Sequence, residues 1–384
     1  MNAKKFSDAM SELDTKYVDE ALNYKKKAKR YGWIKWGAMA ACVAAAILVG
    51  VRMVAPEKNG LSMLTIPDME SSGMGFEGWL GYDITQWDNG NPWSESMEFS
   101  VLPVYQNGSY DAAGKPVGLS RDDMIQRLEI AIAALNLDSY DIETEQECLT
   151  ANADGLQICV YADGMIEVWF EDGQTLPEGY SFTFFDTTDA EAEQALDYLS
   201  QEYSELIGFS EPEKVLSGSY IIWNDYDGAG NYVTEPRLER EYALYDSSGD
   251  DLEDILNYKY NCVRFYPDDN GKLSLIRIYN GLSCAENLGD YPIISTDEAY
   301  KLLLKGHYIT SVPYAITDAE LICKVELVYR NSRTEKTFLP YYRFYVELPE
   351  MRRENGLTDY GAYYVPAIQE EYIRNMPLWD GNIN

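Results

Sequence analysis

The hydrophobic positions nearest the N-terminus form one unbroken run. Residues 36–51 carry no charged side chain, and Arg52 alone interrupts the continuation of the run to Ala55. An α-helix rises about 1.5 Å per residue, so roughly 20 residues cross the hydrocarbon core of a bilayer. The pattern predicts a transmembrane helix at residues 34–54.

Four residues flank this predicted helix as membrane anchors. Lys35 and Arg52 can extend their charged ends to the headgroups, and Trp33 and Trp36 suit the interface between membrane and water. Residues 1–35 carry nine Lys or Arg. Because positively charged flanks stay in the cytoplasm, we expect a cytoplasmic N-terminus and an exported C-terminal part of a single-pass cell-membrane protein.

Two other uses of the apolar run stay open. A cleaved signal peptide would end in a small-x-small site, and no clear site of this kind follows Val54. Cys42 weakly resembles the cysteine of a lipoprotein signal, but the apolar run continues well beyond it. We favour an uncleaved anchor without a lipid.

Ahead of the anchor, apolar residues recur at spacings of three and four, which places them on one stripe of a helix predicted at residues 3–24. The other side carries acidic residues, whereas membrane-surface helices rely on basic ones. The stripe is therefore a candidate contact for a cytoplasmic or membrane protein partner. The alternative is that the helix only extends the anchor and frays, because isolated helices of this length are marginally stable. The stripe consists of Phe6, Met10, Leu13, Tyr17 and Ala21.

Beyond residue 118 a helix followed by strands recurs three times. Ser120, Thr188 and Ser295 each precede a helical pattern and have an acidic residue three positions later, which is typical of an N-terminal cap. This order predicts an α+β fold, in which each helix lies on one face of an antiparallel sheet. The predicted helices span 120–137, 188–207 and 295–304, and the predicted strands span 156–161, 165–170, 219–223, 241–245, 261–266, 273–279, 321–329 and 341–348.

Residues 55–118 show neither a helical nor a strand period and are rich in Gly, Pro, Ser and Asn. We interpret them as a tether leading into irregular structure, with Trp79, Trp87 and Trp93 anchoring it to the domain rather than forming a sugar-binding platform. The predicted organisation is a cytoplasmic segment (1–33), the transmembrane helix (34–54), the tether (55–118), a first α+β region (119–286) and a C-terminal module (287–384).

Charge narrows the classes of partner. Residues 53–384 carry 21 basic and 59 acidic side chains. Nucleic-acid binding needs clustered Lys and Arg to displace counterions from phosphates. The strong negative charge of the predicted exported part therefore excludes nucleic acid as a partner. The acidic surface itself is most simply a solubilising one.

Residues with catalytic or ligand-binding potential give no strong pattern. His307 is the single histidine, and a dyad with Cys284 or Cys323 is conceivable, but nothing in the spacing requires one. We expect His307 to bond helix-terminal carbonyls and the thiols to be buried rather than disulfide-bonded. The run at 73–78 matches a nucleotide-binding glycine pattern in letters only.

The loops at Asp225 and Asp268 could bind calcium, but hairpin turns explain them better. We predict no cofactor and no metal site. A carboxylate pair suited to glycoside hydrolysis depends on separation in space, on which the sequence is silent.

Four C-terminal segments carry a family resemblance: Ile294–Gly306, Val325–Tyr329, Leu339–Val346 and Tyr363–Ile368. They resemble the PepSY-like modules of extracytoplasmic regulators of the YycH/YycI type, which are single-pass proteins of Gram-positive bacteria. The first 50 residues are similar to membrane-anchored clostridial proteins of the anti-sigma type. The resemblance implies a non-enzymatic regulator that binds an envelope protein or peptide. The alternative is a surface glycan-binding protein or a carboxylate-dependent hydrolase using the region before Leu119.

Overall fold

The structure is a computed structural model. It describes residues 57–58, 60–67, 79–80, 90–111, 115–144, 148–185, 187–226, 229, 232–310, 312–331, 335–349 and 358–381; for 57–58, 79–80, 217–226 and 232–236 it describes the backbone alone. The chain divides into two units, residues 1–63 and 64–384. In the first unit, β1 (Glu57–Lys58) pairs antiparallel with β2 (Leu61–Ser62).

The predicted membrane helix at 34–54 lies outside the described residues, so the structure does not test it. Within the described ranges, no helix is both long and apolar enough to cross a membrane.

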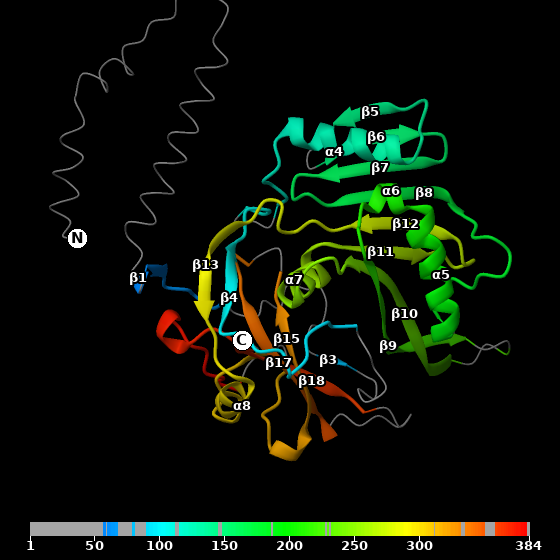
Figure 1. The fold of residues 1–384 in the computed structure, drawn as a ribbon. Helices are drawn as coiled ribbons and strands as arrows, with labels where there is room; N and C mark the ends of the chain where they lie inside the picture. The colour runs from blue at the N-terminus through cyan, green and yellow to red at the C-terminus, as the bar shows by residue number, and fades with distance from the viewer. Residues whose placement is uncertain are drawn as a thin grey trace, which may run out of the picture. The chain divides into compact units, whose positions relative to one another are not determined.

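The second unit contains an eight-stranded antiparallel sheet in the order β5-β6-β7-β8-β12-β11-β10-β9. It is built from two modules, each a helical segment followed by four strands, and the modules join where β8 pairs with β12 (Figure 1). Helix α7, Asp251–Tyr260, is inserted between β10 and β11. The other elements are α4 (Arg121–Ala134), β5 (Asp141–Thr144), β6 (Cys148–Ala153), β7 (Leu156–Tyr161), β8 (Ile166–Gln174), α5 (Asp189–Glu202), α6 (Ser204–Ile207), β9 (Pro212–Tyr226), β10 (Tyr232–Asp246), β11 (Cys262–Pro267) and β12 (Leu273–Ile278).

The helices α4, α5 and α6 cover one face of this sheet. Leu128 of α4 and Leu196 of α5 are fully buried in one core with Val168 and Ile276 of the strands. Removing apolar area from water contributes about 25 cal/mol per Å², which makes this core the main stabilising feature of the two modules.

A second core lies around a sheet in the order β14-β18-β17-β15, onto which β3 also pairs, and a three-stranded sheet β13-β4-β16. Helix α8 packs here through Ala299 and Leu303, and α7 contributes Ile255 and Tyr260. The elements are β3 (Trp79–Leu80), β4 (Val101–Gln106), β13 (Glu286–Pro292), α8 (Thr296–Leu304), β14 (Ile309–Thr310), η2 (Ala319–Leu321), β15 (Ile322–Tyr329), β16 (Thr337–Phe338), β17 (Pro340–Glu347), β18 (Tyr360–Pro366) and η4 (Glu370–Tyr372).

The α+β prediction is confirmed, since the described chain combines helices with antiparallel sheets. Ser120, Thr188 and Ser295 cap their helices with both bonds of the capping box present. The helix predicted at 188–207 is interrupted at Tyr203, where α5 ends and α6 begins.

The interpretation of 55–118 as an irregular tether needs correction. Strand β4 lies within it, between β13 and β16, with Leu102 and Val104 fully buried. Earlier still, Leu64 is buried and its amide donates to the Tyr372 carbonyl at 2.8 Å. These residues lack a long sequence period because the contacts that order them come from distant parts of the chain.

The expectation for Trp93 is consistent with the structure. Its ring meets Tyr342 edge-to-face at 6.2 Å and packs against the second core. The side chains of Trp79 and Trp87 are outside the described part.

Candidate functional site

One of the two outermost strands of the eight-stranded sheet, β5, presents an open edge. Strand β5 pairs with β6 on one side, and no other strand of the described chain pairs with its other side. All four of its residues are exposed. An edge of this kind offers backbone N–H and C=O groups that an extended chain can pair with.

The two faces of β5 differ in chemistry. Ile142 is paired with Ala151, which is buried in the helix-side core, so Ile142 lies on the helix side of the sheet. Its side chain is 48% exposed, and the preceding Tyr140 is 40% exposed. Because side chains alternate along a strand, Asp141 and Glu143 lie on the opposite face. The edge therefore combines an apolar side with an acidic side.

On the face opposite the helices, a polar and aromatic network centres on Glu167 of β8. Its carboxylate accepts hydrogen bonds from the Tyr161 hydroxyl at 3.0 Å, from Trp169 Nε1 at 3.0 Å and from Arg277 Nε at 2.7 Å. The Arg277 guanidinium lies over the Tyr266 ring, 5.2 Å from its centroid. Trp169 remains 42% exposed, so this face keeps an aromatic surface beside fixed polar groups.

The network fixes protonation states. Burial, followed by the nearby Glu167 carboxylate, raises the pKa of Tyr161 well above its ordinary value, so the hydroxyl stays protonated and donates. Burial alone would lower the pKa of Arg277, but Tyr279, Tyr266 and Glu167 outweigh it and the pKa is raised. Arg277 thus stays a cation beside Glu167, and the pair holds this part of the sheet surface in place.

The residues considered for a catalytic dyad have separate partners. The backbone amide of His307 donates to the Leu302 carbonyl in the last turn of α8 at 3.0 Å, which agrees with the expected helix-end contact. Its side chain has another partner, since Nδ1 lies 2.9 Å from the Pro377 carbonyl oxygen. The Cys284 thiol faces the Ala162 carbonyl oxygen at 3.9 Å, and the Cys323 thiol donates to the Leu321 carbonyl oxygen at 3.2 Å.

Cys148, Cys159 and Cys262 are buried thiols, as expected, but Cys284 is only partly buried and Cys323 is exposed, so the expectation of burial is wrong for these two. Cys148 and Cys159 lie on neighbouring strands but not directly opposite each other, because Cys159 pairs with Thr150. The Thr150 hydroxyl lies between them, 3.5 Å from one sulfur and 3.7 Å from the other.

The loop at Asp268 is a hairpin turn, as predicted. One carboxylate oxygen of Asp268 accepts from the amides of Asn270 and Lys272, each at 2.8 Å. Gly271 follows with φ of +75°, a conformation that favours glycine. In the described residues, no three side chains of the metal-binding types come together as a site. The loop after Asp225 is only partly described.

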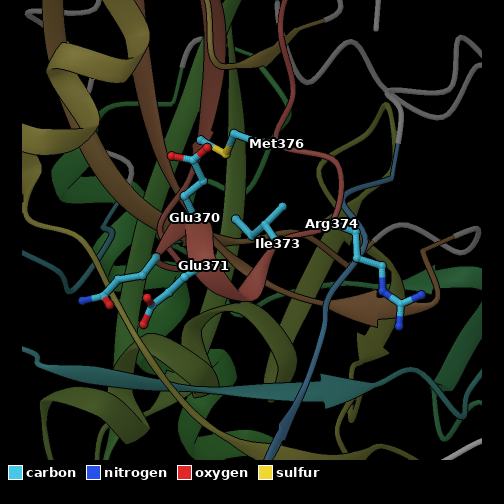
Figure 2. A pocket seen from close by; sticks show the side chains of 6 residues that line it. Glu370, Glu371, Ile373, Arg374 and Met376 are labelled. Atoms are coloured by element: carbon cyan, nitrogen blue, oxygen red, sulfur yellow. The ribbon is translucent and has the colours of Figure 1, made fainter. Parts of the chain in front are cut away.

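A shallow depression of about 600 Å³ lies on the C-terminal segment (Figure 2). Glu370 and Glu371 both line it, but their carboxylates point in different directions, the first toward Met376 and the second away from it. Among the described carboxyl groups with a shifted pKa, Glu239 is the one whose pKa is raised. Burial is the main cause, and the nearby Glu241 carboxylate is the second. Glu239 lies on β10 and does not line this depression.

The candidate partner-binding residues predicted from sequence, Phe6, Met10, Leu13 and Tyr17, lie outside the described residues. So do the anchor residues Trp33, Lys35, Trp36 and Arg52 and the glycine pattern at 73–78. The edge at β5 was not predicted. The alternation from Tyr140 to Thr144 was a readable strand signal, but only the pairing shows that it forms an edge.

No protein-family model matches this sequence, and no curated protein matches it. The resemblance to PepSY-like regulators therefore stays a prediction from the sequence.

Proposed function

We propose that this protein is a membrane-anchored extracytoplasmic sensor or regulator that binds an envelope protein or peptide, without enzymatic activity. The open edge at β5 carries the proposal, because a solvent-exposed edge with one apolar and one acidic side is a surface for recognising an extended chain.

Three further observations support it. The charge-free run at 36–51, preceded by basic residues, suits a single-pass anchor with a cytoplasmic N-terminus. The two helix–meander modules repeat one architecture, and the α8 unit again places a helix before antiparallel strands, although in the different order β14-β18-β17-β15. The segments resembling PepSY-like modules fall on α8, β15, β17 and β18, in the proposed C-terminal module 287–384.

We also propose a contact in the cytoplasm. The stripe from Phe6 to Tyr17 would contact a partner in the cytoplasm or membrane, while the outer unit binds the envelope ligand. A chain crossing the bilayer would link the two events.

A crosslinking pull-down of the full-length protein from its native membrane tests this. The variant Phe6→Asp/Leu13→Asp places charge on the stripe and should lose a specific signalling partner. The matched control Ser11→Asp/Thr15→Asp adds the same charge on the other side of the predicted helix and should keep it. Equal loss in both variants would contradict a contact through the stripe.

The same experiment bears on the alternative function. The exposed Trp169 beside Glu167 and Arg277 suits a sugar ring, since an aromatic face covers the apolar side of the ring while polar groups bond its hydroxyls. Absence of any partner in all samples would overturn the regulator proposal and favour wall glycans as ligands of this face.

A further inference from the structure

We infer that β5 binds an extended peptide in which Lys or Arg alternates with apolar residues, and that the peptide adds as a further strand at this edge. The inference rests on the proposed function and specifies the chemistry of the partner.

The first argument is the backbone. Strand β5 pairs in register with β6 from Asp141 opposite Asn152 to Thr144 opposite Leu149. Its conformation is therefore already that of a sheet strand, and its outer side is open within the described chain. A peptide that pairs there gains main-chain hydrogen bonds without reordering β5.

The second argument is the apolar side. Ile142 and Tyr140 are among the few large apolar side chains of the described chain that remain strongly exposed. Directly opposed side chains in an antiparallel pair lie about 4.5–5.5 Å apart, so residues of the added strand facing the helix side would cover Ile142. Those residues should be apolar.

The third argument is the acidic side. Asp141 and Glu143 are exposed, and the structure records no ion pair for either in its described part. Their neighbours on β6, Asn152 and Thr150, are uncharged. Lys or Arg on the open face of the added strand would supply opposite charge at cross-strand distance. Because side chains alternate along a strand, the bound peptide should repeat every two residues, one apolar and one basic.

The same features disfavour a second copy as the occupant. Antiparallel pairing of β5 with β5 on a common sheet face would bring the acidic side chains of the two strands together, and like charges across strands destabilise the pair. The formal charge of −33 adds repulsion between copies.

The test uses the full-length chain in nanodiscs of zwitterionic lipid, so that basic peptides have no anionic membrane to bind. Three short fluorescent peptides are compared by anisotropy: alternating Val and Lys, the same residues in two blocks, and alternating Val and Glu. We expect the alternating basic peptide to bind at least about tenfold more tightly than either of the others, as two or three matched cross-strand pairs allow. Two further versions of this peptide carry N-methyl groups on alternate amides, one at the odd and one at the even residues. Only one of the two should lose binding, because only one row of amides faces β5.

A charge exchange makes the result specific. Asp141→Lys/Glu143→Lys should lose the basic peptide and prefer the alternating acidic one. Glu193→Lys/Glu205→Lys makes the same change of net charge on α5 and α6, at exposed positions, and should keep the original preference. Circular dichroism of each variant confirms that the fold is retained.

Several results would overturn the inference: equal binding of the blocked peptide, equal binding of both methylated peptides, an equal effect of the two charge variants, or dimerisation through β5. A partner recovered from the native membrane that ignores the β5 variants would refute this inference and leave the proposed function standing. If the β5 variant exchanges its peptide preference but no native partner is recovered, the inference stands and the proposed function is refuted.

Discussion

Glu326 of β15 shows how single residues hold the second core. Its carboxylate is 3% exposed, and it accepts from Arg343 Nη2 at 2.5 Å and contacts Lys324 Nζ at 2.7 Å. Tyr345 adds a bond at 3.3 Å. Burial alone would raise the pKa of Glu326, but the two cations outweigh it and the pKa is lowered. Buried charges tolerate their loss of hydration only when they are paired in this way.

The lowered pKa predicts a pH dependence of stability. In the unfolded chain Glu326 titrates near 4.5, and in the fold it titrates below that value. Its contribution is therefore fully present above about pH 4.5 and is lost as the pH falls through the lower folded value. Thermal unfolding of the wild type and Glu326→Gln should show a gap at neutral pH that narrows on acidification.

The size of the gap follows from burial. Removing one partner of a buried pair costs about 3–5 kcal/mol. The lower end applies here, because Arg343 loses its counter-charge but its side chain is 20% exposed. Glu241→Gln is the matched control, since its bond to Arg264 joins two side chains that are 48% and 41% exposed, and such pairs contribute about 0–1 kcal/mol. A gap for Glu326→Gln that does not depend on pH would contradict the assigned pKa shift.

At the scale of elements, local signals were predictable and partner-dependent ones were not. The helices at Ser120, Thr188 and Ser295 combine a cap with a helical period, and both are readable in a single sequence. The strands β7 and β8 were readable because each alternates apolar and polar residues and a short Asp-Gly turn separates them. Helix α7 has a cap at Asp250, but it is short and was hidden between strands.

The elements that carry the proposed function were harder to predict. Strand β4 is ordered by β13 and β16, which come from far along the chain. The edge role of β5 depends on the order of the whole sheet, which no local pattern contains. The sequence therefore predicted the class of fold and its repeated order, but not the candidate binding surface.

The cap of α8 gives a prediction at this scale. Ser295 Oγ accepts from the Glu298 amide at 3.3 Å, and the Glu298 carboxylate accepts from the Ser295 amide at 3.0 Å. Ser295→Ala should lower the free energy of unfolding by about 1 kcal/mol, because the Glu298 amide in the first turn of α8 loses its acceptor. Ser295→Asp keeps an acceptor and should restore most of it. Equal loss in both variants, measured by denaturant unfolding, would show that packing rather than capping is responsible.

At the scale of the whole molecule, the start and the end of the second unit are joined. Leu64 bonds to Tyr372 and Arg374 through its backbone, and the Asn375 side chain bonds both the amide and the carbonyl of Ile66 at 2.8 Å. Residues 55–63 alone separate this join from the predicted membrane helix. We therefore expect a ligand-induced change in the second core to reach the predicted membrane helix through this short segment.

The accessibility of the thiols tests the central claim that this unit lies outside the cell on a membrane anchor. Cys323 is exposed, whereas Cys148, Cys159 and Cys262 are buried. A membrane-impermeant maleimide added to intact cells should label the full-length protein, and Cys323→Ser should remove most of that label. The buried thiols should react only after denaturation. Labelling of Cys323 in lysed cells but not in intact cells would place the unit in the cytoplasm and contradict the account.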